Sequence, residues 1–288
     1  MRLLLYDYCV STDCEGDLAH AGIMMLQSLQ EAFSTIPEVH IQSVAPDEHK
    51  QTNPEDSLRA TLENCDAALI VAPECDGVLL SLTNLAESMQ KRVLGAPVAA
   101  IAVSSDKGVC LQRWKEMGLL TPRTILLQGE APQSHSLKLT APFVLKPNRG
   151  AGGENAKKYN DTEALDSFIG GDEDYLLQEY IEGEPLSVSC LVREGDVIPI
   201  SLNRQRMAEG GFTCEQVEIL EHDPREEELF ELAKAACSAI PHLRGFTGID
   251  LIYSKQGPVL MECNARITLA FSSMSPQMQK EIALFLLS

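Results

Sequence analysis

The chain has 288 residues, enough for two or three compact domains. Its 42 acidic residues outnumber 23 Lys and Arg, and the net charge of -19 argues against nucleic acid and anionic membranes as partners, because both would repel the chain. Hydrophobic residues make up 44% of the chain, enough for a core, but the longest apolar run, at 93–103, is interrupted by Pro97 and is too short to span a bilayer.

The first part of the chain, residues 1–103, alternates short apolar runs with longer amphipathic segments. The short runs predict strands, and the spacing of apolar residues in the longer segments predicts helices. The expected strands are Leu3–Tyr6, His40–Val44, Ala67–Val71 and Val98–Val103, and the expected helices are Leu18–Phe33, Glu55–Asn64 and Gly77–Arg92. This order indicates an αβα domain with a parallel sheet. The first strand is not followed by G-x-G-x-x-G, so the dinucleotide fingerprint is absent.

Residues 104–177 are expected to form a small second subdomain. Ser104, Ser105 and Asp106 are good caps for a helix that continues to about Met117. The remaining elements expected here are a loop at 132–142, a strand at Phe143–Lys146 and a helix at Asp161–Ile169.

Residues 178–288 are rich in strand signals, and a strand at Tyr175–Ile181 leads into them. The expected strands are Leu186–Val192, Val197–Arg204, Gln216–Leu220, Gly248–Tyr253 and Pro258–Glu262, and the expected helices are Arg225–Ala239 and Pro276–Leu287. The pattern predicts a mainly antiparallel sheet with helices packed against it. The chain is therefore expected to be α/β, with an α+β C-terminal part.

A glycine-rich loop follows the strand that carries Lys146. The side chain of Lys146 shares a face with Val144, and the next seven residues include Gly150, Gly152 and Gly153. Glycine backbones approach an anion closely, and successive N–H groups surround a phosphate. The segment lacks the Walker pattern, so it would be a phosphate loop of another type. A flexible hairpin turn beside a solvated lysine would have the same sequence.

A hairpin near the C-terminus brings two acidic residues together. If residues 255–257 form a three-residue loop, Asp250 faces Glu262 and Gly248 faces Asn264. The expected apolar face carries Ile249, Leu251, Val259 and Met261. Two charges about 4 Å apart repel by about 4 kcal/mol at an effective dielectric constant of about 20, and a divalent cation removes this repulsion. Oxygen ligands suit Mg²⁺, although a solvent-facing acidic pair would give the same pattern.

The apolar strand at 175–181 is followed by acidic residues and a glycine. An extended backbone edge can pair with an adenine, and a nearby carboxylate can accept hydrogen bonds from ribose hydroxyls. An ordinary edge strand would have the same sequence.

Taken in order, these segments resemble the ATP-grasp superfamily of carboxylate–amine ligases. The resemblance covers Ser104 to about Met274, and the preceding αβ part suits the usual N-terminal domain. The segments that carry it are Ser105-Asp106-Lys107, Val144-Leu145-Lys146-Pro147, Gly150-Ala151-Gly152-Gly153, Gln178-Glu179-Tyr180-Ile181-Glu182-Gly183, Gly248-Ile249-Asp250-Leu251 and Met261-Glu262-Cys263-Asn264-Ala265-Arg266.

The resemblance implies a set of roles for residues of this chain. Lys107 and Lys146 would contact ATP phosphates beneath a loop that contains Gly150, Gly152 and Gly153. Arg266 would steady the transferred phosphate. The expected catalytic residues are therefore Lys146 and Arg266. Gln178, Glu179, Tyr180 and Ile181 would frame the adenine, and Glu184 would hold the ribose. Asp250, Glu262 and Asn264 would bind Mg²⁺, with Mn²⁺ as an alternative ion. Two departures are Ala265, where the family usually has proline, and Glu184, which lies one residue after the glycine instead of two.

Shorter segments, Ala72–Gly77, Glu179–Gly183 and Ser201–Gln205, also resemble the tyramine–glutamate ligase group of methanofuran-type coenzyme biosynthesis. The resemblance implies that a carboxylate such as that of glutamate is activated as an acyl phosphate and joined to a tyramine-like amine. Glu74 follows the third expected strand, where it would meet the amine. Arg204 and Arg206 share one strand face and are expected to grip the acidic substrate. A loop acid and solvated arginines are the alternatives.

Two other functions fit the same residues: a nucleotide-binding module that has lost turnover, and an ATP-grasp enzyme with a different acceptor. The nine cysteines show no C-x-x-C spacing, and the first residues contain too short an apolar run for a signal peptide, so we expect reduced thiols in a cytoplasmic protein. The sequence leaves the oligomeric state open, a homo-oligomer included.

Overall fold

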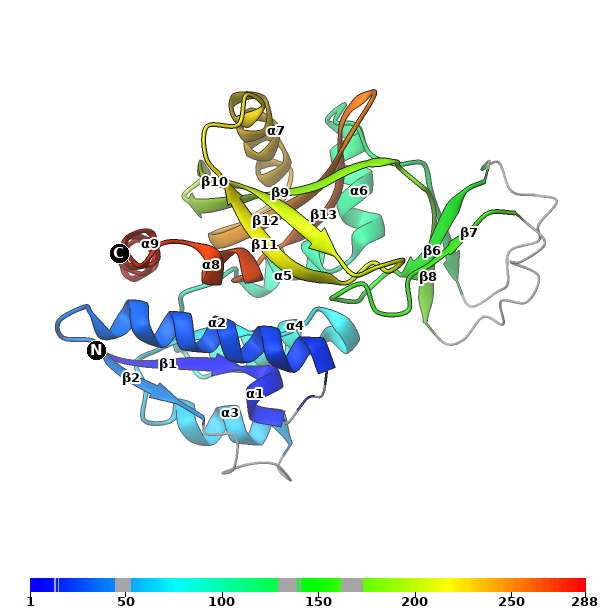
Figure 1. Cartoon of the computed structure of the whole chain (residues 1–288). Helices are drawn as coiled ribbons and strands as arrows, with labels where there is room; N and C mark the ends of the chain where they lie inside the picture. Colours follow the sequence, from blue (N-terminus) through cyan, green and yellow to red (C-terminus); the bar gives the residue numbers. More distant parts are fainter. Residues whose placement is uncertain (13, 15, 45–52, 129–138, 140, 162–172) are drawn as a thin grey trace.

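The structure is a computed structural model of the whole chain. It describes residues 1–12, 14, 16–44, 53–128, 139, 141–161 and 173–288. Figure 1 shows these residues arranged as three sheets with helices around them. The expected helix at Asp161–Ile169 and most of the expected loop at 132–142 lie outside the described residues.

The first sheet is parallel and has the strand order β2-β1-β3-β4. Its strands are β1 (Arg2–Asp7), β2 (His40–Ser43), β3 (Ala67–Val71) and β4 (Arg92–Val93). Its helices are α1 (Tyr8–Thr12), α2 (Gly16–Ser34), α3 (Pro54–Leu62), the 3₁₀ turn η1 (Cys75–Gly77), α4 (Val78–Ser88) and α5 (Val98–Ser104). Leu3 and Leu5 of β1 pack on the α2 side, and Leu4 and Tyr6 pack on the side of α3 and α4. The strand therefore buries both faces, as the αβα prediction requires.

One predicted strand of this region is wrong. Val98–Val103 lies within helix α5, and the fourth strand is the two-residue β4. Pro97 precedes the first turn of α5, and the buried residues Ala100, Ile101 and Ser104 follow helical spacing, whereas in a strand the buried residues would alternate.

The second sheet is antiparallel and has the order β5-β8-β6-β7. Its strands are β5 (Thr124–Gln128), β6 (Phe143–Pro147), β7 (Lys157–Tyr159) and β8 (Asp174–Glu179). A small core of its own, including Phe143, Leu145 and Leu177, lies on one face of this sheet. On β6, Lys146 and Val144 both line a cavity, as strand alternation predicts for residues two apart.

The third sheet is antiparallel and has the order β11-β10-β9-β12-β13. Its strands are β9 (Gly183–Arg193), β10 (Asp196–Met207), β11 (Cys214–Leu220), β12 (Gly245–Ser254) and β13 (Gly257–Asn264). Helices α6 (Lys107–Glu116) and α7 (Glu226–Ser238) pack against it. Buried Trp114 of α6 donates its indole N–H to the carbonyl of Ala236 at 2.9 Å, which joins the two helices. The α+β character predicted for the C-terminal part is confirmed.

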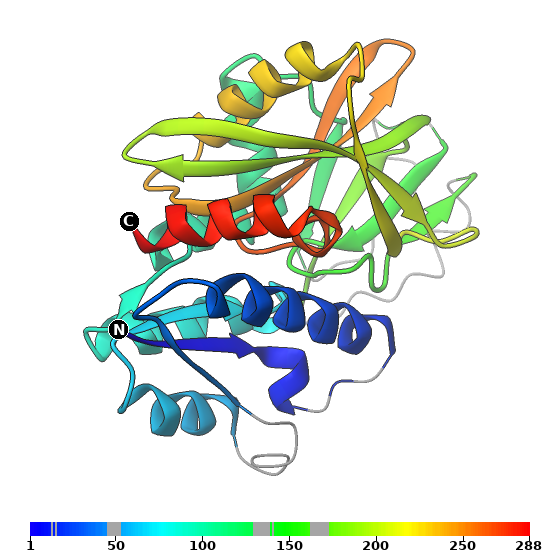
Figure 2. The same cartoon turned by 60° about the vertical axis from the view of Figure 1, so that its left-hand side comes forward.

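Helices α8 (Leu269–Ser273) and α9 (Pro276–Leu287) lie between the first and third sheets, and Figure 2 shows α9 running above α2. Arg92 of β4 donates to the carbonyl of Leu287 at 2.8 Å, and Arg193 of β9 donates to that of Phe285. The end of α9 is thus held from both sides by cations that favour a helix C-terminus.

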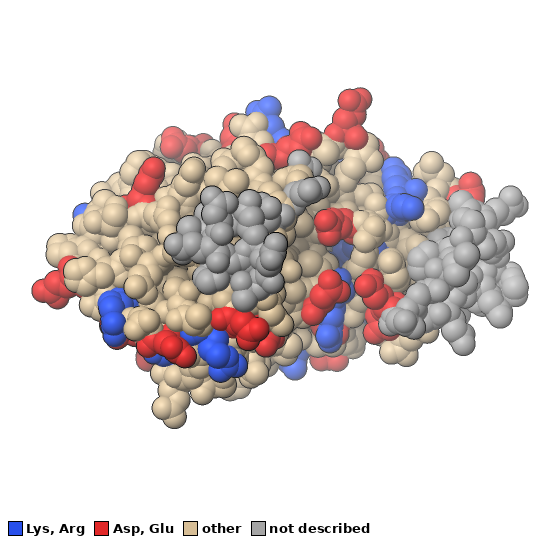
Figure 3. Space-filling model, turned by 90° about the horizontal axis from the view of Figure 1, so that it is seen from below, with Lys and Arg blue, Asp and Glu red and all other residues tan. Residues whose placement is uncertain are grey.

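None of the helices in the described residues is long and apolar enough to cross a membrane. All nine cysteines are free thiols. On the face shown in Figure 3, blue and red side chains are interspersed over the described residues.

Candidate active site

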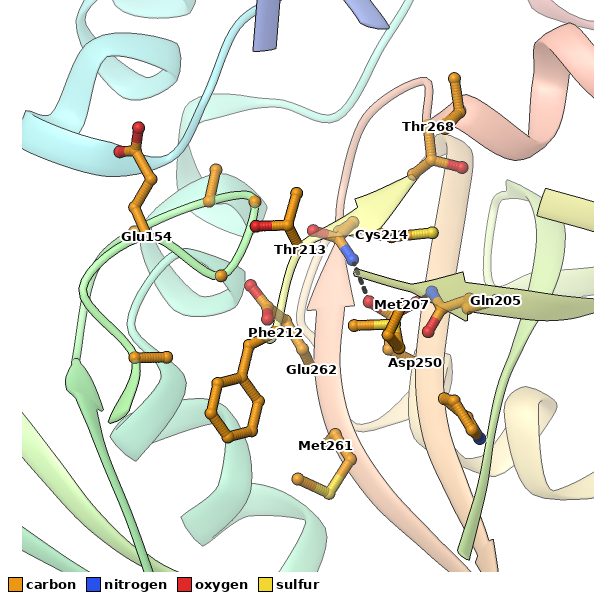
Figure 4. A pocket seen from close by; sticks show the side chains of 18 of the residues that line it. Glu154, Gln205, Met207, Phe212, Thr213, Cys214, Asp250, Met261, Glu262 and Thr268 are labelled. Atoms are coloured by element: carbon orange, nitrogen blue, oxygen red, sulfur yellow. Dashed lines mark hydrogen bonds between the residues drawn. The ribbon is translucent and has the colours of Figure 1, made fainter. Parts of the chain in front are cut away.

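A cavity of about 790 Å³ lies where the three sheets meet. Its walls come from the carboxyl ends of β1 and β3, the start of α2, the loop at 150–154, the segment 178–181, the tip between β10 and β11, and strands β12 and β13. Figure 4 shows Asp250 and Glu262 on adjacent strands of this cavity, with Phe212 and Glu154 on loops around it.

The β12–β13 hairpin reaches the predicted pairing by a different route. Asp250 pairs with Glu262 and Gly248 with Asn264, but the connecting loop has two residues, because Ser254 pairs with Gly257. A bulge at Asp250/Leu251 then restores the predicted register. The predicted three-residue loop is wrong.

The bulge also changes which side chains face the core. Leu260 pairs with Leu251 and is fully buried in place of Met261, which lines the cavity. Ile249 and Leu251 lie in the core as expected, whereas Val259 is buried opposite Ile252, which lines the cavity, so its predicted place on the face of Leu251 is wrong. The placement of Met261 on the core face was therefore wrong.

Asp250 is held by two amides. Gln205 and Asn264 each donate a side-chain N–H to its carboxylate at 3.0 Å. The pKa of Asp250 is raised to about 7, chiefly by burial and then by the charge of Glu262, against which the hydrogen bonds from the two amides act. The pair thus has the electrostatic strain that a cation would relieve.

Two lysines face this carboxylate pair. Lys107 at the start of α6 is buried, and its Nζ lies 3.1 Å from Glu262 Oε1 and 2.5 Å from the carbonyl of Gly150. Lys146 also lines the cavity, and its pKa is lowered to about 8, chiefly by burial, against which the charge of Glu262 acts. Cations and carboxylates from four separate segments therefore meet in one cavity.

The start of α6 is positioned by Asn148, which sequence reasoning did not single out. Its side-chain oxygen accepts the N–H of Gly108 at 2.8 Å, and its amide donates to Asp106 at 3.0 Å. Asp106 also accepts the N–H of Val109, which confirms it as the helix cap. These bonds tie the lysine-bearing helix to the loop that follows Lys146.

The oxygen donors of Asp250, Glu262 and Asn264 fit a hard divalent cation. The described residues contain no group of three His, Cys, Asp or Glu that would hold a metal by itself. Two carboxylates and an amide leave coordination positions for substrate phosphates, which is the arrangement that Mg²⁺ commonly has in proteins.

The glycine loop is closed against two other elements. Gly153 has φ of +74°, and a Cβ at this position would overlap the carbonyl oxygen of Phe212 on the β10–β11 tip. Gly152 has φ of +66°, and a Cβ there would lie 3.1 Å from Leu18 of α2. Both positions therefore need glycine for conformation and for close approach.

The predicted adenine segment lines the far end of the cavity. Gln178, Glu179, Tyr180 and Ile181 all contribute to the wall. The N–H of Tyr180 is already bonded to the carbonyl of Pro142, whereas the N–H of Ile181 has no partner among the described residues. A free N–H at the cavity wall is a suitable donor for a heterocyclic base.

Three predicted site residues, on β9 and β10, lie on the face of the third sheet that is turned away from the cavity. Gly183 and Pro185 line the cavity, so strand alternation directs Glu184 to the opposite face. There Glu184 accepts from Arg225 and Arg204, both at 2.6 Å, and these bonds lower its pKa. The expectation that Glu184 holds the ribose is wrong.

Arg204 and Arg206 also point away from the cavity. They share a face, as predicted, but the cavity receives Gln205 between them. Both arginines form ion pairs with Glu218, at 3.5 Å and 3.3 Å. The expectation that they grip an acidic substrate is wrong, because their partners are acids on the outer face of the sheet.

Arg266 lines the cavity, and Glu74 holds it in place. The Arg266 Nε and Nη2 atoms donate to the two carboxylate oxygens of Glu74, both at 2.8 Å. Glu74 is buried and is not part of the cavity wall among the described residues. The prediction that Glu74 meets the substrate amine is therefore corrected: its carboxylate is taken up by Arg266, which it orients.

Sequence reasoning missed Asp7, which ends β1 and lines the cavity, and Gln205, which supports Asp250. The rule that ligands lie beyond the carboxyl ends of parallel strands would have found Asp7. No sequence pattern marks Gln205, because its role depends on which strand face meets β12.

Comparison with known proteins agrees with this geometry. Residues 104–270 match the family model of the ATP-grasp domain, and residues 26–101 match that of the pre ATP-grasp 3 domain. Over 285 residues the chain is 30% identical to the tyramine–L-glutamate ligase of Methanocaldococcus jannaschii, an alignment that covers 92% of this chain and 82% of that protein.

Solved structures show the same fold. An ATP-grasp superfamily protein from Archaeoglobus fulgidus is similar with a TM-score of 0.71 and 26% identity, covering 95% of this chain and 83% of that one. The D-alanine–D-alanine ligase from Bacillus anthracis, complexed with ATP, has a TM-score of 0.75 at 17% identity, covering 100% and 95%. The predicted family and architecture are confirmed, and the chain belongs to the ATP-grasp family as an ATP-dependent ligase that forms C–N bonds.

Proposed function

We propose that the enzyme joins glutamate to a tyramine-like amine through an acyl phosphate, as a step in the synthesis of a one-carbon coenzyme. The observation that carries the chemistry is the meeting of Lys107, Lys146, Asp250, Glu262 and Arg266 at one cavity. The choice of substrates is supported by the 30% identity to a tyramine–L-glutamate ligase over 92% of the chain.

The reaction needs activation because a carboxylate does not react with an amine at neutral pH. A carboxylate oxygen attacks the γ-phosphorus of ATP, and ADP leaves. The amine then attacks the acyl carbon, a C–N bond forms, and the C–O bond to phosphate breaks with the electron pair leaving on phosphate. The protein contributes orientation and charge stabilisation to these steps.

The places of the side chains in the cavity support the roles that we assign to them. Lys107 and Lys146 would neutralise phosphate oxygens. Glu74 fixes the orientation of Arg266. The guanidinium N–H groups that do not bond to Glu74 would donate to the oxygens of the transferred group. The segment 178–181 supplies backbone groups for the adenine, with the N–H of Ile181 as the donor.

Asp250, Glu262 and Asn264 would hold Mg²⁺, or Mn²⁺ in its place. When bound, this ion neutralises phosphate charge and orients the triphosphate. The carboxylates explain how a chain with a net charge of -19 accepts a polyanion, because its acidic residues at this point carry metal.

Release of ADP and phosphate from ATP tests the proposal. With Mg²⁺ present, release should require both an acid and an amine, and glutamate paired with tyramine should give the highest kcat/KM in a panel of acids and amines. A product that carries an amide bond, seen by mass spectrometry, completes the assignment. Nucleotide binding without release would indicate a binding module instead, and release with an acceptor other than an amine would indicate a different ATP-grasp activity.

A further inference from the structure

Asp7 is a buried carboxylate that the reaction described above does not use. It is the last residue of β1, lines the cavity, and is only 3% exposed. Its Oδ1 atom accepts the backbone N–H of Val10 at 3.0 Å. A Cβ at Gly22 of α2 would lie 2.6 Å from the same oxygen, so the helix approaches this carboxylate as closely as glycine allows. The carboxylate is therefore fixed in position.

The charge of Asp7 has no cation paired with it among the described residues. Arg266 is near enough to lower the pKa of Asp7, but its guanidinium is committed to Glu74. Burial is the larger effect and raises the pKa of Asp7 to about 6, which still leaves the group mostly ionised at neutral pH. A buried carboxylate without a counter-charge is costly, and a cationic ligand would offset that cost.

The walls around Asp7 are apolar. Leu18, Ala21 and Met25 come from the same face of α2 as Gly22, and Val71 is the β3 partner of Asp7. A carboxylate flanked by these apolar side chains suits a ligand with a cationic head and a hydrocarbon body.

We propose that Asp7 binds a primary ammonium group of a substrate and thereby selects for substrates that carry one. This inference rests on the ligase function proposed above. Two sources have the same chemistry: the amine substrate itself, and the α-ammonium group of an amino-acid substrate. Asp7 is a substrate-binding residue in either case, and the test separates the two sources.

The test is Asp7→Asn, which keeps the acceptor oxygen for Val10 and removes the charge. Steady-state kinetics are measured with tyramine and with either glutamate or glutarate, which lacks the α-ammonium group. Loss of a charged hydrogen bond should raise the relevant KM by about 10- to 100-fold. If the amine is the source, the KM for tyramine rises with both acids. If the amino acid is the source, the KM for glutamate rises and that for glutarate does not. A change below about twofold in every KM overturns the proposal.

A measurement without turnover tests the role of Asp7 separately from the proposed reaction. The thermal midpoint of the full chain is measured with tyramine against tyrosol, its neutral hydroxyl analogue, and with glutamate against glutarate. In the wild type one ammonium compound should raise the midpoint more than its partner without an ammonium group, and Asp7→Asn should abolish the difference. If both members of each pair shift the thermal midpoint of the wild type equally, the proposal is contradicted. This outcome uses the wild type alone, so it holds even where Asp7→Asn fails to fold.

Asp66→Asn is the matched control. Asp66 also accepts a backbone N–H, from Arg2 at 2.7 Å, but its side chain is 52% exposed and lies outside the cavity wall. This variant should retain wild-type KM values and both midpoint differences. If the wild type forms no ADP with any pair of substrates, the proposed function fails, whereas the midpoint measurement still decides the role of Asp7.

Discussion

Glu262→Gln is expected to lower the rate of ADP formation by about 100- to 1,000-fold, a loss comparable with removal of a central electrostatic group in other enzymes. The substitution removes one of the two opposed carboxylates and the ion pair that Lys107 makes at 3.1 Å. The affinity for Mg²⁺ in the presence of a non-hydrolysable ATP analogue should fall in parallel, which isothermal titration calorimetry measures.

The fold should survive this change, because it removes the repulsion between the two acids in metal-free protein and Lys107 keeps its hydrogen bond to the carbonyl of Gly150. The folded pKa of Asp250, about 7, lies above its ordinary value of 3.8, so the folded state binds more protons than the unfolded state between these values. The free energy of unfolding should therefore fall as pH rises from about 4 to 7. Glu262→Gln should weaken that fall, because it removes a charge that raises the pKa of Asp250. Full activity together with wild-type Mg²⁺ affinity would contradict the metal assignment.

Lys146→Met is expected to lower kcat/KM for ATP by about 100- to 1,000-fold, because it deletes a cation aimed at the phosphates. The pH dependence gives a second signature. Since burial lowers the pKa of Lys146 to about 8, the empty cavity loses this charge as pH rises through 8. The affinity for an ATP analogue, measured by calorimetry so that ionisation of the amine substrate plays no part, should fall above pH 8.

Lys146→Arg is the control for this prediction. Arginine stays charged throughout the accessible pH range, so the affinity of this variant should be flat above pH 8, where Asp250 is already ionised, whatever its absolute value. A wild-type affinity that is equally flat, or a Lys146→Met variant with unchanged kcat/KM, would show that Lys146 does not contact the phosphates.

The sequence predicts the pairing of Asp250 with Glu262 correctly, although the loop and the register next to it differ. Period-two alternation puts Ile249 and Leu251 on the core face of β12 and leaves Asp250 on the opposite face, where it meets Glu262. The bulge was not predictable, because no residue pattern distinguishes a two-residue loop with a bulge from a three-residue loop. The missed bulge and the wrong loop length cancel at the acidic pair, and they remain visible at Val259, Leu260 and Met261.

Alternation is less informative about which face of a strand meets the site. Arg204 and Arg206 share one face of β10, as predicted. On that face of the third sheet their neighbours are Glu184 and Glu218, and the cavity lies on the opposite face. The choice depends on how the third sheet packs against the glycine loop, which is a tertiary contact between distant segments.

Local pattern also fails where tertiary structure overrides propensity. The apolar run Val98–Val103 suits a strand, yet the first sheet ends at β4 and the run forms a helix whose Ala100 and Ile101 enter the core. Asp7 carries no motif at all, and only its position at the end of β1 and the close approach of Gly22 reveal it.

Transfer of oxygen from the acid substrate to phosphate tests the central claim most directly. Glutamate whose carboxylates are labelled with ¹⁸O is turned over with unlabelled ATP, Mg²⁺ and tyramine, and the released phosphate is analysed by mass spectrometry. An acyl phosphate formed in this cavity predicts that each phosphate carries one labelled oxygen from glutamate. Phosphate that forms in step with the amide but contains no label would contradict activation of the carboxylate by ATP.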